Sequence, residues 1–124
     1  MRAMKPEDTD ILVVEALNMG DLDSAISLYE PDATIEAGPG KFVSGIDAIR
    51  DFHSANMNQN AHTTINVQKI AQAGEIALLV SNWTVKGKDA NGNDIDFVGR
   101  GTEVVRRQKD GAWKFVIDFP TGVE

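Results

Sequence analysis

The chain opens with apolar residues at helical spacing. Ile11, Val14 and Leu17 recur every three residues, so they share one face of a predicted helix. Thr9 or Asp10 can cap its first turn, because short polar side chains accept hydrogen bonds from the free backbone N–H groups there. The start of the chain is therefore predicted to be helical.

A second helix is predicted directly after Gly20, which suits the end of the first. Asp21 can cap it, and apolar residues then repeat at i, i+3, i+4 and i+7 from Leu22 to Tyr29. Pro31 ends the pattern, because proline cannot continue a helix.

Two short strands and a third helix follow. Residues 33–37 and 41–45 have the character of strands, and the helix begins near Gly45. Ile49 and His53 lie on its apolar face, since they are four residues apart.

From residue 63 onward the pattern changes to that of β-strands. Strands are predicted at residues 63–71, 75–87, 94–108 and 112–119. Glycine-containing turns separate them. Helices followed by a meander of strands predict an α+β fold, in which a cone-shaped, curved antiparallel sheet packs on three helices. The sheet has four long strands and a short N-terminal hairpin.

The composition excludes several classes of function. A chain of 124 residues is sufficient for one domain, residues 1–124, with a real core. The formal net charge is -7 and no basic run exists beyond Arg106-Arg107, so no nucleic-acid partner is expected.

No apolar stretch has the length of a membrane span or the pattern of a signal peptide, and no membrane partner is expected. Without cysteine, disulfides and thiol nucleophiles are excluded, and a cytoplasmic location is the default.

Glu103 is the first candidate for chemistry. Strand alternation places it on one face with Phe97, Gly99 and Gly101, a face that is otherwise apolar or glycine. A carboxyl group there is partly desolvated, which raises its pKa as a general acid or base requires. The alternative is that Val98 marks the inner face and that Glu103 is solvated.

Other candidates come from the helices and the remaining strands. His53 has a side chain that can titrate near neutral pH, although a histidine on an apolar helix face is more often a core residue. Trp83 shares a strand face with Leu79 and Ser81, as in the wall of an apolar pocket or in an ordinary core. Tyr29 points into the core and needs a hydrogen-bond partner there.

Asp118 cannot be placed by alternation. It shares a face with Val116 and Lys114, opposite Trp113 and Phe115. One of these two faces meets the helices, so Asp118 is either a buried partner or a surface acid.

No motif for nucleotide, phosphate or nucleophilic chemistry is present, and no metal-ligand spacing occurs. No cofactor and no metal are therefore expected. If the protein is an enzyme, proton transfer by carboxyl and imidazole groups in an apolar pocket is the chemistry that these residues favour.

The order of several motifs resembles the nuclear transport factor 2-like superfamily. Its SnoaL-like and ketosteroid isomerase-like members are similar in the segments "ALNMGDLDSAISLYEPDATIEAGPG", "VSGIDAIRDFH" and "RRQKDGAWKFVIDFP", which together span most of the chain from about residue 9. The resemblance implies a cone-shaped α+β fold. It does not define an activity, because the superfamily includes isomerases, cyclases, dehydratases, hydrolases and assembly modules.

The resemblance carries over only part of the isomerase machinery. The general base of that family corresponds to Ala37, beside Glu36, and its principal hydrogen-bond donor to about Val13. Its second acid corresponds to Glu103. Ordinary ketosteroid isomerase activity is therefore not expected, since removal of a positioned base costs roughly 10² to 10⁴ in rate.

The resemblance implies a pocket that binds a small apolar molecule with a polar group. Its predicted catalytic residues are Glu103, His53 and Asp118, and its predicted substrate-binding residues are Trp83, Tyr29, Ser81, Leu79 and Phe97. The expected activity is that of a cofactor-independent isomerase, cyclase or dehydratase. The alternative is a non-catalytic ligand-binding or dimerisation module. The resemblance also implies a homodimer formed through the outer face of the sheet.

Overall fold

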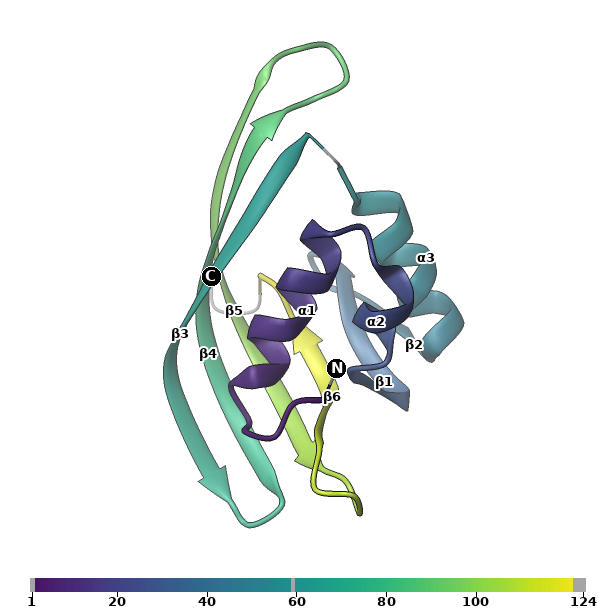
Figure 1. Ribbon diagram of the computed structural model, residues 1–124, viewed down its shortest axis with the longest axis vertical. Coiled ribbons are helices and arrows are strands. Elements are labelled where there is room, and N and C mark those ends of the chain that lie inside the picture. Colours follow the sequence, from purple (N-terminus) through teal and green to yellow (C-terminus); the bar gives the residue numbers. More distant parts are fainter. Residues whose placement is uncertain (1, 59, 122–124) are drawn as a thin grey trace.

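The computed structural model describes residues 2–58 and 60–121. Its elements are α1 (Asp8–Asn18), α2 (Leu22–Ile26), β1 (Tyr29–Gly38), β2 (Lys41–Ser44), α3 (Ile46–Asn56), β3 (Ala61–Ala73), β4 (Ile76–Lys88), β5 (Asp94–Arg107) and β6 (Trp113–Phe119). The three helices lie on one face of the strongly curved sheet (Figure 1). This arrangement confirms the predicted α+β fold.

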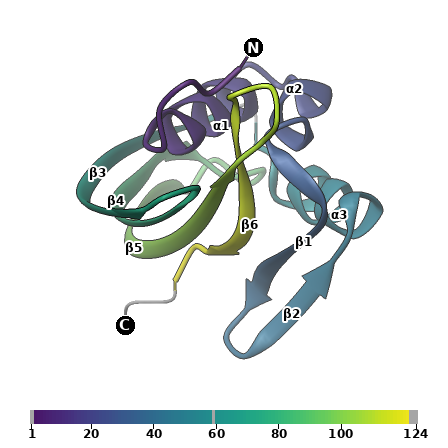
Figure 2. The same cartoon turned by 90° about the horizontal axis from the view of Figure 1, so that it is seen from below.

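The six strands form one sheet in the order β2-β1-β6-β5-β4-β3. Neighbouring strands are antiparallel except β1 and β6, which are parallel, so the sheet is mixed. Seen from below, β3, β4 and β5 curl around the space beside α1, and the β1–β2 hairpin projects away from them (Figure 2). The curl creates room for a cavity on the helix side.

The first helix begins earlier than the sequence indicates. Neither Thr9 nor Asp10 is its cap, because the helix already starts at Asp8 and both residues are buried in its first turn. Thr9 Oγ1 donates to the Pro6 carbonyl at 2.7 Å. The predicted face is also rotated, since Ile11 is exposed while Val13 is buried.

The second helix is capped as predicted but is shorter. Asp21 accepts hydrogen bonds from the backbone N–H of Ser24 at 3.1 Å and from its hydroxyl at 2.6 Å. The helix ends at Ile26, so Tyr29 begins β1 instead of extending the helical pattern. Tyr29 is buried nevertheless, because it pairs with Phe115 of the parallel strand β6.

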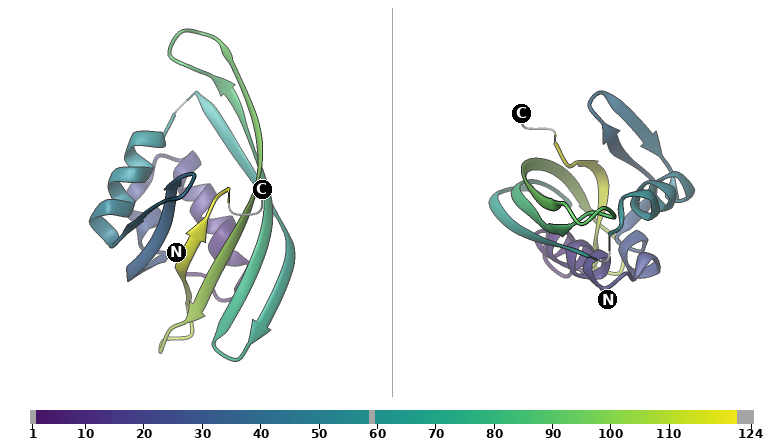
Figure 3. Two further views of the ribbon diagram at one scale, coloured as in Figure 1. Left: turned by 180° about the vertical axis from the view of Figure 1, so that it is seen from behind. Right: turned by 90° about the horizontal axis from the view of Figure 1, so that it is seen from above.

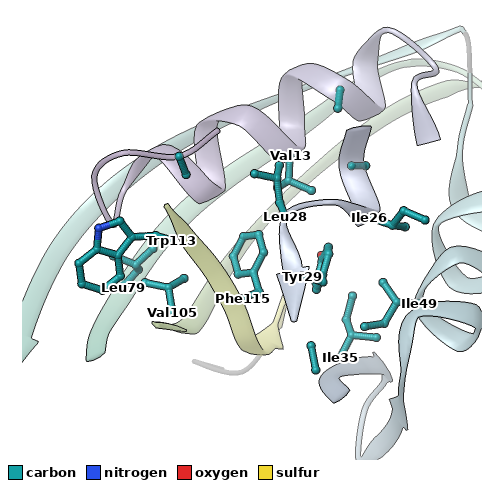
Figure 4. Packing of buried hydrophobic residues seen from close by; sticks show 14 of the residues in the cluster. Val13, Ile26, Leu28, Tyr29, Ile35, Ile49, Leu79, Val105, Trp113 and Phe115 are labelled. Carbon is teal, nitrogen blue, oxygen red and sulfur yellow. The ribbon is translucent and has the colours of Figure 1, made fainter. Parts of the chain in front are cut away.

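The hydrophobic core lies between the helices and the sheet (Figure 4). The rings of Tyr29 and Phe115 pack with their centroids 4.8 Å apart. Ile49 from α3 meets Ile35 of β1 at one end of this core, and Leu79 lies near Val105 at the other. The core thus fixes α3 and β6 on either side of β1, and both elements carry polar residues of the site.

Candidate functional site

An apolar cavity of about 240 Å³ lies between α1, α3 and the curled strands. Its apolar wall includes Val13, Leu17, Phe52, Ile65 and Trp83. Tyr29, His53, Thr63, Ser81, Asp10, Glu103 and Asp118 supply its polar groups. Seven different elements therefore contribute polar side chains to one cavity.

Regular alternation of β5 places Glu103 inside. Glu103 is 3% exposed, whereas Val98 on the opposite face is 78% exposed, so the pocket-facing interpretation holds and the solvated one is wrong. Ser81 of β4 donates its hydroxyl to the Glu103 carboxyl group, at 3.1 Å to Oε1 and 3.3 Å to Oε2. Gly101 lies opposite Ser81 and leaves space for these groups, because a Cβ at Gly101 would lie 2.6 Å from Glu103 Oε2.

A β-bulge in β6 turns Asp118 toward the helices. Val104 pairs with Ile117, and the next residue, Val105, pairs with Phe115, so Val116 is an extra residue in β6. Beyond the bulge Asp118 pairs with Glu103. Both Phe115 and Asp118 are consequently buried on the same side, which explains why strict alternation could not place Asp118.

Asp118, Tyr29 and His53 form a hydrogen-bonded chain. The Tyr29 hydroxyl donates to Asp118 Oδ2 at 2.6 Å. The His53 Nε2 atom lies 3.0 Å from the same hydroxyl oxygen. Because the tyrosine proton is directed at Asp118, the arrangement assigns the Nε2–H tautomer to His53, which then donates to Tyr29.

Burial separates the protonation states of these groups. It raises the pKa of Glu103 to about 11, and hydrogen bonding and repulsion from Asp10 act in the same direction. It raises the pKa of Asp118 to about 7, although the hydrogen bond from Tyr29 opposes the rise. Burial lowers the pKa of His53 to about 4 and raises that of Tyr29 well above its usual range. At neutral pH, Glu103, Tyr29 and the neutral imidazole keep their protons while Asp118 is near its midpoint.

Asp10 is the polar residue that sequence reasoning missed. It is 2% exposed, and burial raises the pKa of its carboxyl group while a hydrogen bond to Glu103 lowers it. The signal was present in the sequence, since Asp10, Val13 and Leu17 follow the spacing i, i+3 and i+7 of one helix face. Treating Asp10 as a helix cap concealed it.

Six of the eight predicted site residues line the cavity, and two do not. Glu103, His53, Asp118, Trp83, Tyr29 and Ser81 line it. Leu79 lies in the core. Phe97 is 61% exposed on the β4–β5 hairpin, which extends beyond the helices (Figures 1 and 3). Phe97 lies on the same face of β5 as Glu103, as expected, but none of the helices in the described residues covers that part of the sheet.

Trp83 is held at the wall by two neighbours. Its indole Nε1–H donates to the Pro120 carbonyl at 2.7 Å. Gly99 lies opposite in β5, and a Cβ there would collide with the indole ring. Gly99 therefore leaves room for the Trp83 ring, and the group that approaches this glycine most closely is a side chain of the protein.

A smaller hollow of about 140 Å³ adjoins the cavity. It shares Leu17, His53, Thr63 and Val85 with the cavity, and Asn18 and Asn56 also line it. His53 therefore stands between the two spaces.

The described part of the chain has no group of three or more histidine and acidic side chains that could hold a metal ion. Among the described residues, none of the helices has the length and apolar character needed to cross a bilayer.

Solved structures similar to this one include a ketosteroid isomerase-like protein from Erwinia carotovora atroseptica, with a TM-score of 0.81 and 17% identity over 96% of this chain and 94% of that chain. A proposed ketosteroid isomerase from Shewanella frigidimarina has a TM-score of 0.77 and 22% identity, covering 92% of each chain. A proposed dehydratase of the NTF2-like family from Streptomyces avermitilis has a TM-score of 0.76 and 16% identity, covering 91% of this chain and 92% of that chain. At these identities the likeness concerns the fold alone.

Comparison with curated proteins by sequence gives no match. The sequence profile of the SnoaL-like domain matches residues 12–116, which include most of the elements that build the cavity. The chain therefore belongs to the SnoaL-like domain family.

Proposed function

We propose that this protein is a cofactor-independent enzyme that transfers a proton on a small, largely apolar molecule, as isomerases, cyclases and dehydratases do. The observation that supports this most is the meeting of Asp10, Glu103 and Asp118 with a tyrosine–histidine pair in one apolar cavity. Environments that push the pKa values of neighbouring acids apart are a feature of acid–base active sites.

Asp118 is the proton-transfer group in this proposal. A pKa of about 7 lets its carboxyl group both take and return a proton near neutral pH. Tyr29 orients it, and His53 supports Tyr29 from the other side. Glu103 keeps its proton and serves as a neutral acid, steadied by Ser81.

The cavity limits the size of the substrate. At the packing density of protein interiors, about 0.74, a space of about 240 Å³ holds roughly ten non-hydrogen atoms. Trp83 and Phe52 offer this molecule an aromatic wall. The usual ketosteroid isomerase reaction is not part of the proposal, because Ala37 stands where the resemblance places the base.

Hydrogen exchange next to a carbonyl group tests the proposal while the substrate is still unidentified. Small cyclic ketones incubated with the protein in heavy water should exchange their α-hydrogens faster than in buffer, as followed by proton NMR. Asp118→Asn should lower this rate by roughly 10² to 10⁴, because the positioned base is lost. Asp96→Asn is the matched control, since Asp96 is an exposed acid on β5.

Two results would count against this function. One is exchange no faster than in buffer across the ketones. The other is an Asp118→Asn protein that is as active as the Asp96→Asn control.

One observation favours a second candidate function, a non-catalytic ligand-binding module. The Tyr29 hydroxyl is hydrogen-bonded to both His53 and Asp118, and the Ser81 hydroxyl is hydrogen-bonded to Glu103. Most polar groups of the cavity are therefore hydrogen-bonded to one another. A ligand that binds in the cavity without any hydrogen exchange in the experiment above would favour this candidate.

We also propose that the protein forms a homodimer through the outer face of the sheet. Ile76 and Leu78 are large apolar side chains exposed next to each other on this face of β4, and Val98 is exposed on the same face further along the sheet, opposite Thr84. Exposed apolar side chains gathered on one face are a feature of interfaces between copies.

A further inference from the structure

The polar end of the cavity contains acids and no cationic side chain. Asp10, Glu103 and Asp118 line it, whereas no lysine or arginine of residues 2–58 and 60–121 does. None of the ion pairs among the described residues involves one of these three acids. His53 is neutral, because burial lowers its pKa to about 4. The cavity thus becomes negative as soon as one acid ionises.

Asp10 has unused capacity to accept hydrogen bonds. Its Oδ2 atom is buried, and no N–H and no alcohol or phenol hydroxyl of the described residues donates to it. The protonated Glu103 carboxyl group is the neighbour that bonds to Asp10. A carboxylate has about four lone-pair positions, so one bond leaves Asp10 able to accept more. A buried acceptor of this kind favours a ligand that brings a donor.

Aromatic side chains line the same cavity. Trp83, Phe52 and Tyr29 all contribute to its wall. The faces of such rings attract cations, and the attraction is stronger where water is excluded. Acids and aromatic rings around one space together suit a positively charged group better than a neutral one.

We propose that the molecule bound in this cavity carries a protonated amine, with its ammonium group on Asp10 and its apolar part against Trp83 and Phe52. This inference rests on the proposed function, because it names the class of molecule on which that site acts. Asp118 remains free for proton transfer in this arrangement. A carboxylate ligand is disfavoured, because it would meet the acids without any cation.

Three compounds of similar size and different charge test this inference. Benzylammonium, benzyl alcohol and benzoate are titrated into the protein near neutral pH by calorimetry. We expect the ammonium compound to bind about tenfold tighter than the alcohol, with benzoate weakest. Asp10→Asn should reduce the affinity for benzylammonium to that for the alcohol, because it removes the charge and keeps the shape. Asp8→Asn in the same helical turn is the control and should preserve the preference, since Asp8 does not line the cavity.

The outcomes separate this inference from the function on which it rests. Equal or tighter binding of benzyl alcohol would overturn the amine while leaving the cavity as a site for apolar molecules. Retention of the ammonium preference in Asp10→Asn would overturn the role of Asp10. If none of the three compounds binds at millimolar concentration, both the inference and the proposed small-molecule site fail. Glu103→Gln serves as a second variant: if Asp10→Asn does not fold, Glu103→Gln should keep the ammonium preference, and its loss would overturn the assignment to Asp10.

Discussion

Glu103 and Asp118 face each other across β5 and β6 but hold their protons with different strength. Burial raises the pKa of both, yet the hydrogen bond from Tyr29 favours the ionised form of Asp118. Glu103 instead meets another carboxyl group, that of Asp10, which favours its protonated form. The same side-chain chemistry therefore takes two protonation states at one site.

This difference predicts how stability depends on pH. The unfolded Glu103 ionises above about pH 4.5, while the folded one holds its proton to about pH 11. The unfolded state therefore binds fewer protons in this window, and the free energy of unfolding falls as pH rises. Between pH 7.5 and 9 the titrations of Asp118 and His53 contribute little, because their folded pKa values are about 7 and about 4. Over this interval the wild type should lose about 2 kcal/mol of its free energy of unfolding, and Glu103→Gln should not show this loss, as measured by urea unfolding at each pH.

Glu75→Gln is the control for this measurement. Its hydrogen bond from Arg107 lowers the pKa of Glu75, so its charge is constant between pH 7.5 and 9. The control should follow the wild type. Identical slopes for wild type and Glu103→Gln would mean that Glu103 is already ionised in the folded protein.

At the scale of elements, two glycines of β5 decide what the neighbouring strand can carry. Gly99 lies opposite Trp83, and Gly101 lies opposite Ser81. Glycines at alternate positions of a strand can mark a bend or the close approach of a ligand. Here they accommodate the indole ring and the Glu103 carboxyl group.

A Cβ at Gly99 would force the indole ring aside. Gly99→Ala is therefore expected to destabilise the fold by about 1–3 kcal/mol, because overpacking strains the strands. Thermal unfolding followed by circular dichroism measures this effect. Thr102→Ala, on the outer face of the same strand, should cost less. A Gly99→Ala protein as stable as wild type would show that Trp83 has room to move.

The sequence predicted the elements well where periodicity was regular. Alternation along β5 grouped Glu103 with Gly99 and Gly101 correctly, because no bulge interrupts β5 between Asp94 and Val104, but it left open which face of the strand is buried. Asp118 could not be placed, since the extra residue in β6 depends on pairing with a distant strand. Phe97 was misplaced for another reason: parity gives the face of a strand, but not how far the helices cover it.

At the scale of the whole molecule, the outer face of the sheet is the surface where a second copy is expected. Leu78 lies on this face, 42% exposed. Leu78→Asp should convert the dimer to a monomer, because it places a charge in an apolar interface. Light scattering measures this change in molecular mass. Ile11→Asp is the matched control, since Ile11 is also 42% exposed but lies on α1. A monomeric wild type, or equal effects of both variants, would contradict the proposed dimer.

Trp83 stands in the wall of the cavity, and the chain has only one other tryptophan, Trp113, which is buried in the core. The protein thus contains its own optical reporter of occupancy. A molecule that enters the cavity replaces water beside one indole and leaves the other unchanged. Replacing Trp113 by phenylalanine would leave a single emitter at the site, so collections of unlabelled compounds could be screened by intrinsic fluorescence before any substrate is identified.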